Sequence, residues 1–176
     1  MRLNRYYYFV EGKCEEKLLE TLKEQRNMLL PGRIHCFNMV QERISEAMIR
    51  AIPPDTTVIL VFDTDTDKSD ILRENIRFLK SHYHIKAVWC VMQIENLEDE
   101  LVRSTDVSKI TELTDSKSEK DFKRDFIHER NLFDKLERHA FDYDIIWSQI
   151  PSGSFSDLVN DGARVKIKRN NHHGRS

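Results

Sequence analysis

Through residue 103 the chain alternates short apolar runs with longer stretches in which apolar residues recur every three or four positions. An apolar run of about five residues between turn signals is typical of a buried strand in a parallel sheet. The predicted strands are Tyr6–Val10, Arg33–Val40, Thr57–Phe62 and Ile85–Gln93. The amphipathic stretches between and after them predict helices over Cys14–Met28, Gln41–Ile52, Asp70–His82 and Glu95–Arg103. This alternation predicts an α/β fold with a mostly parallel sheet.

The pattern changes after residue 104. Thr105–Glu119 is polar and predicts a surface loop or a short helical insert, whereas Asp121–Ala140 has an apolar face and predicts one or two helices. A late apolar stretch, Asp144–Trp147, predicts a strand that returns to the sheet edge. We expect a sheet of about four to five strands flanked by helices, with a helical C-terminal extension. The expected divisions are a core over residues 1–104, an extension over 105–163 that completes the same domain, and a basic, flexible tail over 164–176.

Composition narrows the class of protein. The 176 residues are 39% hydrophobic and 33% charged, which is typical of one globular domain with a solvated surface. A formal net charge of -2 gives no global attraction to nucleic acid or membranes, so such binding would need local basic patches. Cys14, Cys36 and Cys90 are odd in number and widely spaced, which argues against a disulfide framework or a zinc site. Without a signal-peptide pattern or an apolar stretch of roughly 20 residues, we expect a cytoplasmic protein with no membrane partner.

Acidic residues follow two of the predicted strands. Tyr6–Val10 leads into Glu11, and Thr57–Phe62 leads into Asp63 and Asp65. Ligands of open α/β sheets bind beyond the carboxyl ends of the strands, so we expect these side chains to share one crevice. A cluster of carboxylates is costly unless a cation neutralises it, and hard oxygen ligands suit Mg²⁺ or Mn²⁺. The sequence therefore predicts a divalent metal site.

The Glu11-Gly12 turn, the Asp63-x-Asp65 turn and the α/β pattern together resemble a Toprim domain. This catalytic domain is shared by topoisomerases, bacterial primases, OLD-family nucleases and small stand-alone nucleases. The resemblance covers roughly residues 6–103 and depends on the conjunction of both motifs after apolar strands, since neither motif is specific alone. Glu16 extends the first motif to Glu-Gly-x-x-x-Glu, where many family members carry an acidic residue.

The resemblance implies a Toprim-like core and assigns roles within it. Glu11 would be a metal ligand or general acid/base, and Asp63 and Asp65 would be the catalytic aspartates that hold Mg²⁺ or Mn²⁺. Gly12 would let the backbone approach a substrate phosphate closely, because it has no Cβ. Asp67 is an additional acid that would bind a second metal ion or lie in solvent.

A further acidic stretch follows the fourth predicted strand and resembles the additional glutamates of OLD-like and RloB-like Toprim nucleases. Glu95 is the preferred candidate for this extra metal ligand because it lies nearest the strand exit, and Glu98 is the alternate. Two-metal enzymes use such carboxylates to place ions at the attacking and leaving oxygens. The alternative interpretation is that these acids only stabilise the start of a helix.

Basic residues are also needed to contact a phosphodiester. Lys13, beside Glu11, and Lys123, between two phenylalanines of the predicted helix, are the candidates for substrate binding, with Lys120 and Arg124 nearby. The alternative is that each is a solvated surface charge.

The chain is too short for the additional domains of topoisomerases and primases, which leaves metal-dependent hydrolysis of nucleic-acid phosphodiester bonds by a stand-alone nuclease. The resemblance suggests a bacterial or phage-defence setting, with a partner ATPase or defence protein. One alternative is a haloacid-dehalogenase-like phosphatase, because Asp63-Thr64-Asp65-Thr66 matches that family's nucleophile motif. Another is a catalytically inert α/β module that binds a partner protein.

Overall fold

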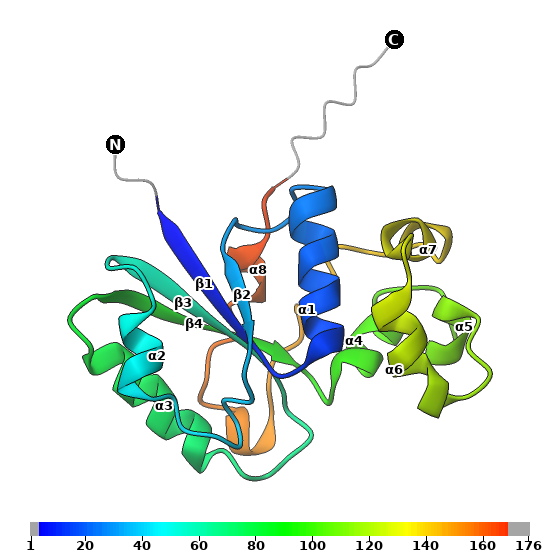
Figure 1. The fold of residues 1–176 in the computed structure, drawn as a ribbon. Helices are drawn as coiled ribbons and strands as arrows, with labels where there is room; N and C mark the ends of the chain where they lie inside the picture. The colour runs from blue at the N-terminus through cyan, green and yellow to red at the C-terminus, as the bar shows by residue number, and fades with distance from the viewer. Residues whose placement is uncertain (1–3, 169–176) are drawn as a thin grey trace.

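The computed structural model describes residues 4–168. At its centre is a four-stranded sheet with the order β2-β1-β3-β4 (Figure 1). Neighbouring strands are all parallel. The strands are β1 (Arg5–Val10), β2 (Arg33–Cys36), β3 (Thr56–Asp63) and β4 (Ile85–Gln93). The predicted α/β class and parallel sheet are confirmed.

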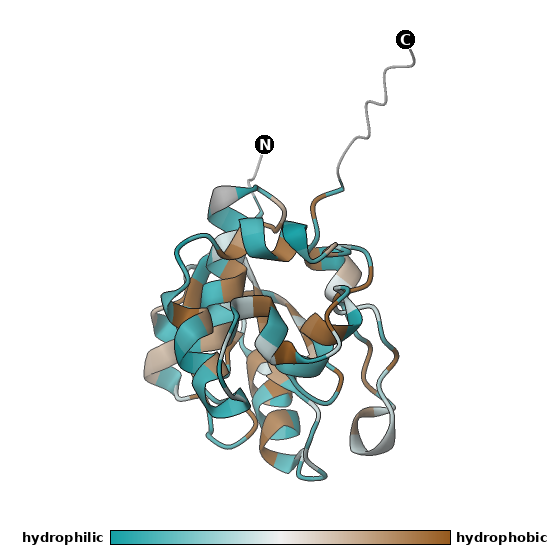
Figure 2. Cartoon of the chain, turned by 90° about the vertical axis from the view of Figure 1, so that its right-hand side faces the viewer, coloured by the Kyte–Doolittle hydropathy of each residue, from teal (hydrophilic) through white to brown (hydrophobic). Residues whose placement is uncertain are grey.

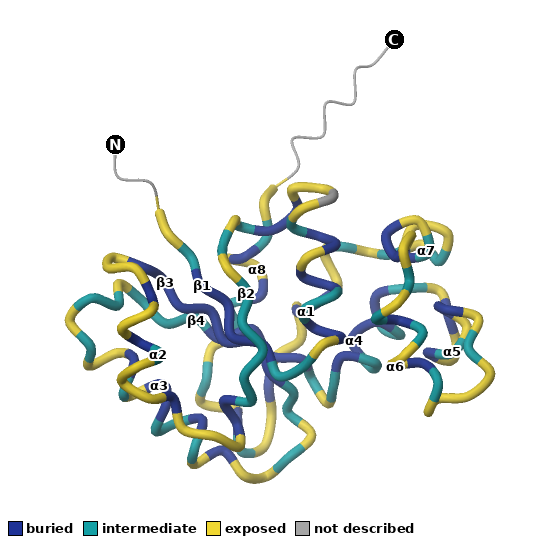
Figure 3. Tube along the Cα trace, viewed as in Figure 1, coloured by how far each residue is buried: buried dark blue, intermediate teal, exposed yellow. Residues whose placement is uncertain are grey.

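Helices cover both faces of this sheet, which is why its central strands are almost entirely buried (Figure 3). Helix α1 (Lys13–Glu20), which continues as a π-helical turn over Thr21–Gln25, lies on one face. Helices α2 (Glu46–Arg50) and α3 (Asp70–Ser81) lie on the other (Figure 1). Successive residues of β1 alternate between the faces: Tyr8 belongs to the apolar cluster of α1, and Phe9 to that of α2 and α3. Hydrophilic and hydrophobic residues alternate along the helices, as their amphipathic pattern requires (Figure 2).

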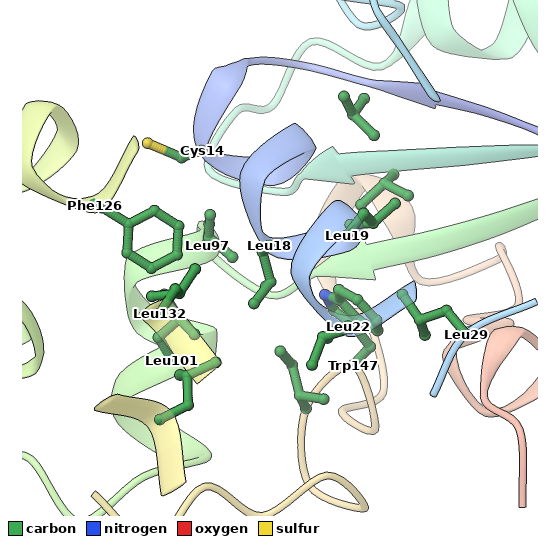
Figure 4. Packing of buried hydrophobic residues seen from close by; sticks show 14 of the residues in the cluster. Cys14, Leu18, Leu19, Leu22, Leu29, Leu97, Leu101, Phe126, Leu132 and Trp147 are labelled. Carbon is green, nitrogen blue, oxygen red and sulfur yellow. The ribbon is translucent and has the colours of Figure 1, made fainter. Parts of the chain in front are cut away.

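The helices after β4 extend the α1 side of the molecule. They are α4 (Leu97–Arg103), α5 (Ile110–Thr114), α6 (Glu119–His128) and α7 (Leu132–Arg138). Phe126 and Leu132 pack in the same apolar cluster as Leu18 of α1 and Leu97 of α4 (Figure 4). The helical extension and the sheet therefore share one hydrophobic core, and the polar stretch before α6 contributes a short helix to it.

Two predicted elements are shorter than expected because local side chains start turns. The predicted strand Arg33–Val40 ends at Cys36, and Asn38 Oδ1 then accepts hydrogen bonds from the backbone N–H groups two and three residues ahead, at 3.2 and 3.1 Å. The predicted helix Gln41–Ile52 is reduced to α2, whose N-cap Ser45 accepts a 3.3 Å hydrogen bond from the helix backbone.

The late strand predicted over Asp144–Trp147 is wrong. The segment forms turns, and Trp147 has a φ of 56°, which lies outside the extended region. The N–H of Trp147 donates to Glu100 Oε2 at 2.9 Å instead of to a strand. The apolar pattern was therefore a signal of burial, since Trp147 is 1% exposed, and not of sheet pairing.

Side chains near the C-terminus occupy the outer edge of β4 in place of that strand. Asp161 Oδ2 accepts from the N–H of Cys90 at 2.9 Å, and Asn160 Oδ1 accepts from the N–H of Met92 at 3.1 Å. The segment that carries them contains a 3-10 turn over Gly153–Phe155 and ends in α8 (Gly162–Val165).

The predicted flexible tail needs a partial correction, because residues 164–168 are held in the fold. Val165 is buried, and its carbonyl accepts a 2.9 Å hydrogen bond from Leu30. Lys166 forms an antiparallel bridge with Leu29. The rest of the predicted tail, 169–176, lies outside the described residues. Within residues 4–168, no helix combines the length and apolar character needed to cross a membrane.

Candidate functional site

The carboxyl ends of β1 and β3 place three of the predicted acids together. The two strands are neighbours, and Val10 is in register with Val61, so Glu11 follows β1 beside the end of β3 at Asp63. Glu11, Asp63 and Asp65 line one cleft of about 510 Å³, which we call the β2-side cleft. The parallel register thus brings together acids that lie about fifty residues apart in the sequence.

Partial burial and mutual repulsion make two of these carboxyl groups, Glu11 and Asp63, weak acids. Desolvation, followed by the charges of Glu11 and Glu15, raises the pKa of Asp63 from 3.8 to about 8. Desolvation, followed by the charge of Glu15, raises the pKa of Glu11 from 4.5 to about 7. Ionising both groups therefore carries a free-energy cost that protons or a cation would relieve.

Glu15 is a site residue that the sequence analysis missed in favour of Glu16. Glu15 is 7% exposed, burial raises its pKa, and its charge acts on both Glu11 and Asp63. Glu16 is half-buried, and its carboxylate binds Nζ of the exposed Lys13 at 2.6 Å. Helical periodicity contained the missing signal, because Glu15 lies three and four residues before the buried Leu18 and Leu19.

Gln93 is a second residue that the sequence analysis missed. It ends β4 in register with Asp63, and its Nε2 donates to Asp63 Oδ1 at 2.5 Å and to Glu15 Oε1 at 3.4 Å. Its Oε1 is buried and has no hydrogen-bond partner among the described residues. Gln93 therefore orients two of the carboxylates and leaves one unused oxygen near them.

The predicted glycine is explained by its neighbour and not by its backbone conformation. Gly12 precedes α1 with an extended φ of -155°, which any residue can adopt. A Cβ at this position would lie 3.1 Å from Glu15 Oε2. The absence of a Cβ on Gly12 therefore leaves space for the buried carboxylate of Glu15.

Both predicted substrate lysines border the same small cleft beside Asp63. This α1 cleft, of about 180 Å³, is lined by Gly12, Lys13, Glu15, Asp63, Glu98 and Lys123. Lys123 Nζ lies 3.3 Å from Glu98 Oε1, and the Glu98 charge raises the pKa of Lys123. Each lysine is therefore near the acids, but each is also paired with a glutamate.

Of the two glutamates proposed as an extra ligand, the alternate, Glu98, shares clefts with Asp63, whereas the preferred one, Glu95, shares a cleft with Asp65. Glu98 lines two clefts that Asp63 also lines. Glu95 is exposed and has a φ of 65°, and it lines a separate outer cleft of about 250 Å³ together with Asp65 and Asp67. Asp65 also lines the β2-side cleft, so Glu95 and Asp67 adjoin the main group through Asp65 and not through Glu11 or Asp63.

The donor chemistry of this site fits a hard divalent cation. Glu11, Glu15, Asp63 and Glu98 supply carboxylate oxygens whose repulsion a cation would relieve, and Gln93 supplies an unpartnered amide oxygen. Within residues 4–168, however, no group of three or more His, Cys, Asp or Glu side chains is arranged to hold a metal ion. Binding would therefore require the carboxylates to rearrange around the ion.

Asp161, the acid that precedes α8, has a structural role at the sheet edge. Asp161 Oδ2 accepts from the backbone of β4, and Asp161 Oδ1 lies 3.3 Å from Arg164. These contacts tie Asp161 to the sheet edge.

Comparisons with known proteins found no relative of this chain. No protein-family model matches the chain, and no match was found among curated proteins or solved structures. Interpretation of the site therefore depends on its own residues.

Proposed function

We propose that this protein is a Mg²⁺- or Mn²⁺-dependent nuclease that hydrolyses phosphodiester bonds of DNA or RNA. The observation that carries the proposal is the pair of half-buried carboxyl groups with raised pKa values, Glu11 and Asp63, at neighbouring strand ends, with Glu98 and the buried Glu15 beside them. Structural acids are usually paired with bases or exposed, whereas buried acids with strongly raised pKa values cluster at functional sites.

In this proposal Asp63, Asp65 and Glu15 hold the ion, and Glu11 is a further ligand or the group that exchanges a proton with water. Such an ion polarises the scissile phosphate and lowers the pKa of water. Gln93 keeps Asp63 oriented through its 2.5 Å hydrogen bond. Lys13 and Lys123 border the same cleft and would contact the phosphate after exchanging their glutamate partners for it.

A defence setting, with a partner ATPase or another defence protein, is the biological context we propose with this activity. It comes from the resemblance to small Toprim nucleases, and a pull-down from the source cells would test it.

The activity can be tested on purified protein with single- and double-stranded DNA and RNA, in Mg²⁺, Mn²⁺ or EDTA. We expect cleavage that requires a divalent ion and that Asp63→Asn reduces by at least about a hundredfold, as loss of a catalytic group does. Glu15→Gln should also abolish cleavage, whereas the matched control Glu16→Gln should retain it, because the carboxylate of Glu16 pairs with Lys13. Full activity of Asp63→Asn would refute the site.

Two other outcomes would identify the alternatives. Turnover of phosphomonoesters with an acyl-phosphate on Asp63 would indicate a phosphatase. No cleavage and no ion-linked rise in melting temperature would indicate an inert binding module.

A further inference from the structure

Two clefts meet at the same pair of aspartates. The β2-side cleft lies between the turn after β2 and the start of α3, and Asn38, Gln41 and Lys68 contribute to it. A second cleft of about 660 Å³, which we call the helical cleft, lies between α4 and the α5–α6 pair. Asp63 and Asp65 are the residues that line both clefts.

The two clefts extend from the aspartates toward different parts of the molecule. Their walls come from α3 in one case and from α4, α5 and α6 in the other, and these elements lie on opposite sides of the strand ends (Figure 1). A strand laid across these aspartates would therefore reach the walls of both clefts. A site closed on one side would hold only the end of a chain.

Each cleft carries lysines whose ammonium groups are not engaged. Lys68 lines the β2-side cleft, and Lys109 and Lys120 line the helical cleft. All three are exposed, and none forms an ion pair or a side-chain hydrogen bond with any of residues 4–168. Other basic side chains of the described residues, such as Lys123, are instead paired with a carboxylate, here that of Glu98. Free lysines on both sides of the acids suit the phosphates that flank a scissile bond.

Carboxylates also line the helical cleft, and they set a condition for binding. Glu98, Asp99 and Glu119 face the same space as Lys109 and Lys120. Together with Asp65 these acids outnumber the lysines of the cleft, Lys109, Lys120 and Lys123, so the cleft without a cation repels a polyanion. Binding should therefore depend on a divalent ion even when no bond is cut.

We infer that a nucleic-acid strand crosses Asp63 and Asp65 from one cleft into the other, so that the enzyme cuts internal phosphodiester bonds. This inference rests on the proposed function. In the reaction water forms a new bond to phosphorus, the ester P–O bond breaks, and the proton of water passes to the leaving oxygen. Lys68 holds the phosphates on one side of that bond, and Lys109 and Lys120 hold those on the other.

Covalently closed substrates test the cutting mode directly. Circular single-stranded DNA, circular RNA and supercoiled plasmid have no ends, so cleavage of any of them to the linear form supports the inference. If the wild type degrades linear nucleic acid but leaves every circle intact, the inference is wrong and the proposed function stands. If the wild type cuts neither linear nor circular substrates, both fail.

A binding assay tests the two-sided path without relying on cleavage. Fluorescence anisotropy of labelled oligonucleotides with Ca²⁺ should show binding that EDTA abolishes. Lys68→Ala and the double variant Lys109→Ala/Lys120→Ala should each weaken binding by about fivefold or more. Each lysine lost should reduce the slope of log affinity against log salt by about 0.7 for single strands.

The control variant is Lys80→Ala/Lys86→Ala, which removes the same charge from the opposite end of the sheet, where α3 ends and β4 begins. It should bind like the wild type. Weakening by only one of the two cleft variants would place the substrate on one side and overturn the inference. So would equal weakening by the control variant.

Discussion

Replacing Asp63 with asparagine should make the protein more stable while removing its proposed activity. The pKa of Asp63 is raised to about 8 in the folded chain, compared with 3.8 in its ordinary state. A carboxyl group with a raised folded pKa keeps a proton that the unfolded chain has already released. Stability is therefore lost as the pH rises from about 4 through 8, and asparagine, which stays neutral, should avoid that loss.

The magnitude follows from proton linkage. If one proton is released on unfolding, the free energy of unfolding changes by about 1.4 kcal/mol per pH unit. Between about pH 6 and pH 8 the wild type should therefore lose roughly 2 to 3 kcal/mol in the absence of divalent ions. For a chain of this size that corresponds to roughly 5 to 10 °C in Tm. Glu11, with a pKa raised to about 7, adds to the loss at the lower end of this range.

Thermal denaturation followed by circular dichroism, in EDTA across this pH range, measures the effect. Asp63→Asn should show a flatter profile and a higher Tm at pH 8, because the amide oxygen can still accept from Gln93. Adding Mn²⁺ should raise the wild-type Tm most at pH 8, where the ion replaces the protons. Asp67→Asn, an exposed control, should behave like the wild type. A wild type whose stability increases with pH, or a destabilised Asp63→Asn variant, would refute this account of the site.

Three further changes test other parts of the structure. Glu15→Gln should weaken Mn²⁺ binding in isothermal titration calorimetry by about tenfold or more, whereas Glu16→Gln should leave it unchanged, because only Glu15 faces the buried acids. Glu100→Ala should lower the free energy of urea unfolding by about 3 kcal/mol or more, since this fully buried carboxylate accepts from the N–H of Trp147 and of residue 94. Gly162→Ala should also destabilise the fold in the same assay, by about 2 kcal/mol or more, because its Cβ would lie 2.1 Å from the carbonyl oxygen of Trp147. A wild-type unfolding midpoint for either of the last two variants would contradict the packing described here.

The sequence was most informative where a single physical requirement determined the residues. The run before Asp63 had to be a buried strand because nearly every position is apolar, and the regular stripe over Asp70–His82 could only be an amphipathic helix. Parallel neighbours then made the approach of Glu11 to Asp63 predictable. These are consequences of burial and periodicity, which a sequence displays directly.

The remaining features depend on contacts between distant segments. Gln93 had no distinguishing mark until β4 paired with β3 in a register that placed it opposite Asp63. The burial of Trp147 resembled a strand because apolarity alone does not specify where a backbone N–H donates. Glu15 was different, because the apolar periodicity of α1 already places it on the buried face of the helix. The Toprim motif pointed to Glu16 instead.

The hydrogen bonds of Asn160 and Asp161 also protect the molecule against self-association. An outer strand with free N–H and C=O groups is a template on which another chain can add a strand and start aggregation. Here a carboxylate and an amide satisfy the N–H groups of Cys90 and Met92 from within the same chain. Because these side chains lie in an irregular segment, they block that edge without offering a new strand for an incoming polypeptide to pair with.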